Sequence, residues 1–337
     1  MDGFGSMLKD YLDYNKISQT DFADRLGISQ KHMNEIINGK TNLSIDLILG
    51  ISLLTDIDAN LIYYVENKKR LNDELILKYK NTKSINNLLN SFYIKEMVKK
   101  GWIKLKDSSS YIQNYMDLLE YLNVKDISKI DEYLEKRYLF KRKNESDNKK
   151  IFLWIKHCDN MIKNISAPKY DSSKFNELLN ELKIESNKKF NKDDIINILL
   201  KYGIILCVED ALTGSKVRGV SKVMIDTPVI YMTSYYKEKS SFYFTLYHEL
   251  MHIKKEYNIL KKKTVVDDED NESEMDKLAL NEMIDDNIYK EILKDISKSK
   301  EISKKYNIPL GFIYSRLAYD KKISYTSKVY LSSREKI

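Results

Sequence analysis

Glycine and proline are scarce in this chain, with 10 glycines and 3 prolines among 337 residues. Both residues mark turns and loops, which propellers and other folds of many short strands need in quantity. A mainly α-helical chain is therefore expected. Apolar residues make up 42% of the sequence, enough for packed cores. At roughly 100–200 residues per domain, the length predicts two or three domains.

Several classes of protein are excluded by the same sequence. No run of about 18 apolar residues occurs, so no membrane span is expected. The first residues lack a basic segment followed by an apolar core, so no secretory signal is visible. The two cysteines, Cys158 and Cys207, cannot build a disulfide framework. We therefore expect a cytoplasmic protein.

Two polar runs divide the chain. Residues 66–70 and 141–150 are rich in charge and are the best linker candidates. They delimit a first domain at 1–70, a helical middle region at 71–165 and a C-terminal domain at 166–337. Apolar residues recur at a spacing of three to four in the middle region, which is typical of packed amphipathic helices.

The C-terminal domain contains apolar runs that are too short for helices and are punctuated by glycine and proline. They predict a small antiparallel β-sheet followed by a helix beginning near Ser240. The fold class expected is therefore α+β, mainly α with a small antiparallel sheet. The three expected strands are 203–209, 219–225 and 229–233, and two short helices are expected at 301–306 and 310–319.

Residues 18–40 carry the first motif, SQTDFADRLGISQKHMNEIINGK. Gly27 stands where a tight turn would separate two short helices, and Ala23 is small where they would cross. Ser29 can cap the second helix. This is the plan of a helix-turn-helix, whose second helix enters the DNA major groove.

Five polar residues of this motif are candidate DNA contacts. Gln30, Lys31 and Asn34 would share the outer face of the second helix, and such side chains pair with base edges. Gln19 and Lys40 suit phosphate contacts. The net charge offers little support for DNA binding, because residues 1–70 carry 8 basic and 10 acidic side chains and the net charge of the whole chain is only +7.

This stretch resembles the XRE-type repressors, and its continuation through residue 70 is similar to HigA-type antitoxins. The resemblance implies binding to operator DNA. A homodimer is expected, because such domains read two-fold symmetric operators.

The second motif is HExxH at residues 248–252, inside the run FYFTLYHELMHI. Residues four apart share one face of a helix, so His248 and His252 can bind one ion. Glu249 would stand beside them as the general base. The chain has four histidines in total, so a chance match is improbable.

A zinc site of this type needs a third protein ligand. Glu272 is the favoured ligand, and Glu274 is the alternative. Asp276, one helical turn after Glu272, would orient a ligand histidine as a supporting carboxylate.

The region from about residue 203 to residue 324 resembles the ImmA/IrrE family of metallopeptidases. The motifs that carry the resemblance are the HExxH run, ESEMDKLALNEMI and EISKKYNIPLGFIYSRLAYDKKIS. The resemblance implies a gluzincin-like fold, zinc as cofactor, and cleavage or control of a helix-turn-helix repressor.

The expected chemistry is hydrolysis of a peptide bond. Zinc would lower the pKa of a water molecule toward neutrality, and Glu249 would accept its proton. A further donor would stabilise the oxyanion. Tyr247 or the pair Tyr235 and Tyr236 are candidates, and the sequence does not choose among them.

Three functions compete. The first is a DNA-binding transcriptional regulator whose zinc endopeptidase domain cuts a partner repressor or its own chain. The second is a HigA-like antitoxin that binds operator DNA and a toxin and has a catalytically silent peptidase fold. The third is a plain protease that uses its N-terminal helices to dock substrate.

Overall fold

The computed structural model describes residues 3–140, 145–234, 237–266 and 273–337. The chain divides into two compact units, Met1–Glu120 and Tyr121–Ile337. The boundary lies inside one helix, α8 (Tyr111–Leu122). Each unit is described by itself.

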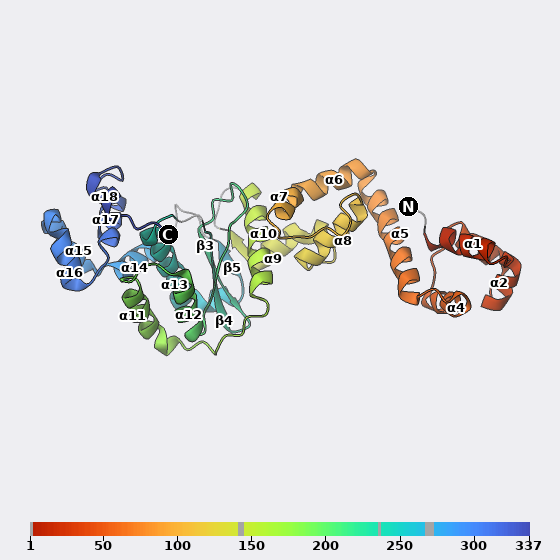
Figure 1. Cartoon of the computed structure of the whole chain (residues 1–337), viewed down its shortest axis with the longest axis horizontal. Coiled ribbons are helices and arrows are strands. Elements are labelled where there is room, and N and C mark those ends of the chain that lie inside the picture. The colour runs from red at the N-terminus through yellow and green to blue at the C-terminus, as the bar shows by residue number, and fades with distance from the viewer. Residues whose placement is uncertain (1–2, 141–144, 235–236, 267–272) are drawn as a thin grey trace. The chain divides into compact units, whose positions relative to one another are not determined.

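The first unit is entirely helical over its described residues (Figure 1). Its first five helices enclose one apolar core, to which Phe4, Phe22, Met33 and Ile51 contribute fully buried side chains. The helices that precede α8 are α1 (Phe4–Tyr14), α2 (Gln19–Leu26), α3 (Gln30–Ile37), α4 (Ile45–Thr55), α5 (Ala59–Tyr79), α6 (Thr82–Ser91) and α7 (Ile94–Lys99).

Serine caps and a glycine explain the helix-turn-helix boundaries. Ser18 Oγ accepts the backbone N–H of Asp21, and Ser29 Oγ accepts that of His32, so each helix begins at a serine N-cap. Gly27 ends α2 at φ +71°, a left-handed conformation that glycine adopts without steric cost. The expected turn between two short helices is confirmed.

The interpretation of residues 66–70 as a linker is wrong, because these residues lie inside the long helix α5. Glu66 is buried there and accepts the backbone N–H of Phe4 at 2.9 Å. Lys69 and Arg70 bond to the carbonyl oxygens of Gly39 and Leu43. The hydrogen bonds of residues 66–70 therefore connect α5 to the helix-turn-helix core. The second linker candidate is in part helical, since its residues 145–150 belong to α10.

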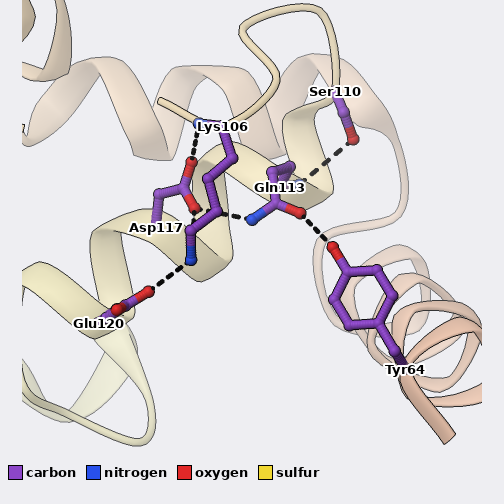
Figure 2. Close-up of polar contacts among 6 residues, drawn as sticks. All are labelled: Tyr64, Lys106, Ser110, Gln113, Asp117 and Glu120. Atoms are coloured by element: carbon purple, nitrogen blue, oxygen red, sulfur yellow. Dashed lines mark hydrogen bonds and ion pairs between the residues drawn. The ribbon is translucent and has the colours of Figure 1, made fainter. Parts of the chain in front are cut away.

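A polar network joins α5 to α8 (Figure 2). Tyr64 on α5 donates to Gln113 Oε1 at 2.9 Å, and Gln113 Nε2 donates to Asp117 Oδ1 at 2.7 Å. The backbone N–H of Lys106 donates to Asp117 Oδ2 at 2.8 Å, and the Lys106 ammonium bonds to Glu120. Asp117 is buried, so these donors offset the cost of removing its carboxylate from water.

The second unit combines helices with two small sheets (Figure 1). Its helices are α9 (Ile130–Arg137), α10 (Glu145–Ile162), α11 (Phe175–Glu185), α12 (Lys192–Lys201), α13 (Lys239–Leu260), α14 (Ser273–Met283), α15 (Asp286–Lys294), α16 (Ser299–Tyr306), α17 (Leu310–Tyr319) and α18 (Lys328–Ser333). Its 3-10 turns are η1 (Ile127–Lys129), η2 (Ser172–Lys174) and η3 (Ile296–Lys298), and its strands are β1 (Tyr138–Phe140), β2 (Ile205–Val208), β3 (Gly219–Met224), β4 (Thr227–Met232) and β5 (Thr264–Val266).

The three expected strands and the two short C-terminal helices are confirmed, but the sheet is mixed rather than antiparallel. Strands β3 and β4 form an antiparallel hairpin, whereas β2 pairs with β4 in parallel. The short connection of residues 209–218 leads from β2 to β3 on the far side of β4, so β3 runs opposite to β2 and β4 then returns parallel to β2. A separate parallel pair, β1 and β5, was not expected.

Helix α13 is the central element of the second unit. It packs against β3, β4 and α14, and 14 of its 22 residues are buried. It begins at Lys239, one residue before the expected start, and it kinks at Glu256. The mainly α, α+β fold class is confirmed. No helix in the described part of the chain has an apolar stretch long enough to cross a membrane.

Candidate functional site

The helix-turn-helix presents the predicted DNA contacts at its surface. Gln30, Lys31 and Asn34 are exposed on α3, and Lys40 is exposed in the turn after it, while Gln19 on α2 is half-buried. Opposite these residues, Met33 and Ile36 anchor α3 in the core. The second helix therefore offers a polar outer face, as groove recognition requires. His32, next to this face, is half-buried.

The HExxH motif lies on α13, where the two histidines converge. The Nε2 atoms of His248 and His252 are 3.1 Å apart, and both side chains are buried. The i, i+4 spacing on a helix causes this approach, as expected.

A carboxylate lies next to the Nδ1 atom of each imidazole ring. Asp276 Oδ1 on α14 lies 2.9 Å from Nδ1 of His248, and Glu256 Oε2 lies 2.8 Å from Nδ1 of His252. A carboxylate only accepts, so each Nδ1 donates and each Nε2 carries the lone pair. Carboxylates in this position fix the tautomer of metal-binding histidines. The predicted pairing of Asp276 with a motif histidine is thus present in the geometry.

The distance between the two Nε2 atoms fits a shared cation. Two nitrogens bound to one tetrahedral zinc ion at about 2.05 Å lie about 3.3 Å apart. Two neutral rings that direct lone pairs at each other at 3.1 Å repel, so a shared proton or a metal ion would stabilise the pair. A borderline metal such as zinc suits two imidazoles with a carboxylate.

Glu249 is buried beside the histidines and is held by β3. Ser221 Oγ lies 2.6 Å from Glu249 Oε2 and 2.9 Å from the Glu249 carbonyl oxygen. Gly219 approaches from the same strand: a Cβ there would lie 2.4 Å from Glu249 Oε1. Strand β3 therefore holds the carboxylate with the Ser221 hydroxyl, and Gly219 leaves the space that the carboxylate occupies.

The third zinc ligand stays a prediction. Glu272 lies outside the described residues, and the alternative, Glu274, is exposed in the first turn of α14. Within the described ranges, no third His, Cys, Asp or Glu joins the two histidines in a metal-binding group.

The predicted oxyanion donors have different outcomes. Tyr247 is fully buried in the hydrophobic core against Tyr243, and burial raises its pKa well above the usual value. It is therefore a core residue. The pair Tyr235 and Tyr236 lies outside the described residues.

Three residues near the site escaped the sequence analysis. Tyr319 donates to Asp276 Oδ2 at 3.2 Å, and burial and then the Asp276 carboxylate raise its pKa, so the phenol stays protonated at neutral pH. Glu256 could have been found, because it stands one helical turn after His252. Ser221 and Tyr319 come from distant parts of the chain and give no local signal.

His157 and Trp154 lie near Glu209 in the second unit. His157 Nε2 lies 3.8 Å from Glu209 Oε2, and Trp154 is fully buried and donates its indole N–H to the Glu209 carbonyl. Trp154 is therefore a core residue.

Comparison with known proteins identifies the first unit only. Residues 8–62 match the family described as Helix-turn-helix. No curated protein and no solved structure matches the chain. The candidate metal site of the second unit therefore rests on the geometry of its own residues. The chain carries a helix-turn-helix domain of the kind by which transcriptional regulators bind DNA.

Proposed function

We propose that this DNA-binding regulator carries, in its second unit, a zinc-dependent endopeptidase of the ImmA/IrrE type. The observation that carries the proposal is the approach of the His248 and His252 Nε2 atoms to 3.1 Å, with each Nδ1 held by a carboxylate. Buried lone pairs arranged in this way favour a metal ion. Zinc would be held by His248, His252 and Glu272.

Glu249 has the features of a general base. Its carboxylate is adjacent to the two histidines on α13 and is constrained by Ser221 and Gly219. When bound, zinc lowers the pKa of a coordinated water and polarises a carbonyl group. Glu249 takes up the proton released during attack and delivers it to the departing amine.

The substrate class that we propose is polypeptide, either a partner helix-turn-helix repressor or the chain itself. We choose this substrate class because both units belong to one chain, and cleavage between or within them would end repression. Cutting a bond anywhere in residues 59–79 would break α5, which packs into the helix-turn-helix core.

The first experiment measures metal. Purified full-length protein should contain about one zinc per chain by elemental mass spectrometry. His248→Ala and Glu272→Ala should lose it, whereas Glu274→Ala, the matched control, should retain it. Zinc retained by His248→Ala would refute the site.

The second experiment measures cleavage. Zinc-loaded full-length protein is incubated alone and with a quenched fluorescent peptide library, and the products are identified by mass spectrometry. Glu249→Gln should keep its zinc and lose cleavage, typically by more than a hundredfold. Cleavage that persists in Glu249→Gln refutes its role. Absence of cleavage in the zinc-loaded wild type refutes the peptidase and leaves an antitoxin-like binding protein as the competing function.

The third experiment addresses DNA and assembly. A selection from random-sequence DNA with the full chain should enrich a two-fold symmetric site, and sedimentation should give a dimer on it. Asn34→Ala should relax sequence preference and cost about 1–3 kcal/mol, whereas Lys40→Ala should weaken all sequences alike and reduce the salt slope by about one. Enrichment of no sequence would refute operator recognition.

A further inference from the structure

A cleft of about 470 Å³ lies within the second unit, and Phe244 in its lining is a neighbour of His248. This volume is in the range of ligand pockets, about 300–1,000 Å³. Its apolar lining includes Phe244, Leu280 and Met283, contributed by α13 and α14. Tyr319, Tyr325 and Tyr330 also line it.

The cleft approaches the candidate metal site along one face of α13. Ser241, Thr245 and His248 recur at a spacing of three to four, so they share that face. The ring of Phe244 lies 6.2 Å from the ring of His248, and Tyr319 donates to Asp276, which holds His248. A polypeptide bound in the cleft would therefore lie next to His248.

The charge in this cleft is predominantly positive. Four basic side chains line it among the described residues, against one carboxylate, that of Glu238. Glu238 is already engaged, because Arg334 Nε lies 2.7 Å from one of its oxygens and Tyr330 donates to the other at 2.9 Å. The other basic residues of the lining are Arg218, Lys237 and Arg316.

Two of these cations stand at the surface, and one is fixed. Arg218 and Lys237 are exposed, whereas Arg316 stacks on the Tyr289 ring at 4.4 Å and bonds to Asp320 through Nε. The first turn of the 22-residue helix α13 also lines the cleft, and its macrodipole adds positive potential there. The cleft therefore attracts anions more than cations.

We propose that this cleft binds the polypeptide substrate and selects segments with Asp or Glu side chains next to the scissile bond. The apolar lining would receive the aliphatic and aromatic side chains of the same segment. This inference rests on the proposed peptidase function, but the binding step is separable from the hydrolysis.

The test measures binding without turnover. Fluorescence anisotropy follows two labelled twelve-residue peptides, one with four Asp and Glu residues and one with Asn and Gln in their place, on full-length Glu249→Gln protein. The acidic peptide should bind at least about tenfold more tightly in low salt, and the difference should shrink as salt screens the charges. Equal affinity for the two peptides would overturn the proposal.

Substitution locates the site. Lys237→Gln should weaken the acidic peptide about two- to fivefold and leave the neutral peptide unchanged, because it removes one exposed charge. Lys300→Gln, on α16 outside the cleft, is the matched control and should change neither affinity. Equal effects of Lys237→Gln and Lys300→Gln would refute the assignment. Arg218→Gln combined with Lys237→Gln should enlarge the loss, with melting curves as a check on folding.

Two further arms separate the outcomes. Inorganic phosphate that binds the cleft while neither peptide binds would indicate a small-anion site and overturn the proposal. The same titrations on metal-free protein do not depend on zinc or on cleavage. Preference for the acidic peptide there supports the cleft even if the peptidase tests fail. Equal affinity for the two peptides in zinc-loaded Glu249→Gln protein, while the wild type cleaves, refutes the cleft alone.

Discussion

Removal of the Asp276 carboxylate tests whether α14 fixes the orientation and the tautomer of His248 for metal binding. In the structure, Asp276 Oδ1 accepts the Nδ1–H of His248 at 2.9 Å, and Oδ2 accepts the Tyr319 hydroxyl at 3.2 Å. Asp276→Ala leaves His248 in place but frees its ring to rotate and to change tautomer. Its Nε2 would no longer be held 3.1 Å from that of His252.

The expected loss of zinc affinity is tenfold to a hundredfold, about 1.4–2.7 kcal/mol, which is the usual effect of removing a carboxylate behind a ligand histidine. The geometry favours the upper half of this range. The Asp276 side chain is 19% exposed and that of His248 is 7% exposed, so water replaces the lost acceptor poorly.

The assay is competition between full-length protein and a chelator of known zinc affinity at pH 7.5. Tyr319→Phe is the matched control, because it removes the other hydrogen bond to Asp276 and retains the carboxylate. Its effect should stay below about threefold, since Tyr319 is 47% exposed and water can replace its hydroxyl. A zinc dissociation constant for Asp276→Ala within threefold of the wild type would refute the reasoning.

Three further predictions follow from close approaches and burial. Gly219→Ala should abolish cleavage but retain zinc, because the new Cβ would lie 2.4 Å from Glu249 Oε1 and would displace the carboxylate. Elemental analysis measures the zinc and product analysis measures the cleavage. Retained cleavage would contradict the steric argument. Gly5→Ala should destabilise the first unit by about 3 kcal/mol or more, since its Cβ would lie 2.2 Å from a backbone oxygen of α3. Gly27→Ala should cost only about 1–2 kcal/mol, because alanine there must adopt a left-handed backbone conformation. Urea unfolding of the two variants checks which loses more stability. Cys158 is fully buried and burial raises its pKa, so a thiol reagent at pH 8 should label it only as fast as the protein opens; rapid labelling of the native protein would contradict this.

Local signals in the sequence predicted the parts of the fold that depend on neighbouring residues. The serine caps, Gly27 and the apolar spacing were sufficient for the helix-turn-helix, because caps and turns act within a few residues. The i, i+4 histidines were sufficient for their convergence on one helix face. Asp276 lies 2.9 Å from Nδ1 of His248, although it comes from another helix, and its role at a metal site stays a prediction.

Tertiary context decided the parts that the sequence analysis missed. Short apolar runs such as β2 and β4 carry no information on strand direction, so the parallel pairing had no local signal. Residues 66–70 look like a solvated linker, but Glu66 is buried and accepts the backbone N–H of Phe4, 62 residues earlier. Ser221 reaches Glu249 from β3 only after the sheet has formed.

The surroundings of Glu249 bear on whether the second unit is an active enzyme or a silent scaffold. Glu249 is 5% exposed, and its carboxylate lies against β3, where Ser221 Oγ contacts Oε2 and Gly219 has no side chain next to Oε1. Burying a carboxylate costs stability, and a fold kept only as a scaffold would gain from losing it.

Glu249→Gln in metal-free protein should therefore raise the free energy of unfolding by about 1 kcal/mol while abolishing cleavage in the zinc-loaded form. The amide has nearly the same volume and can still accept from Ser221, so packing should change little. Denaturant unfolding of the two metal-free proteins makes the measurement, with Glu274→Gln as an exposed control. A fall in stability of similar size would mean that Glu249 is a structural residue. The catalytic assignment would then lose its physical basis, because the constraint imposed by Ser221 and Gly219 would serve the fold alone.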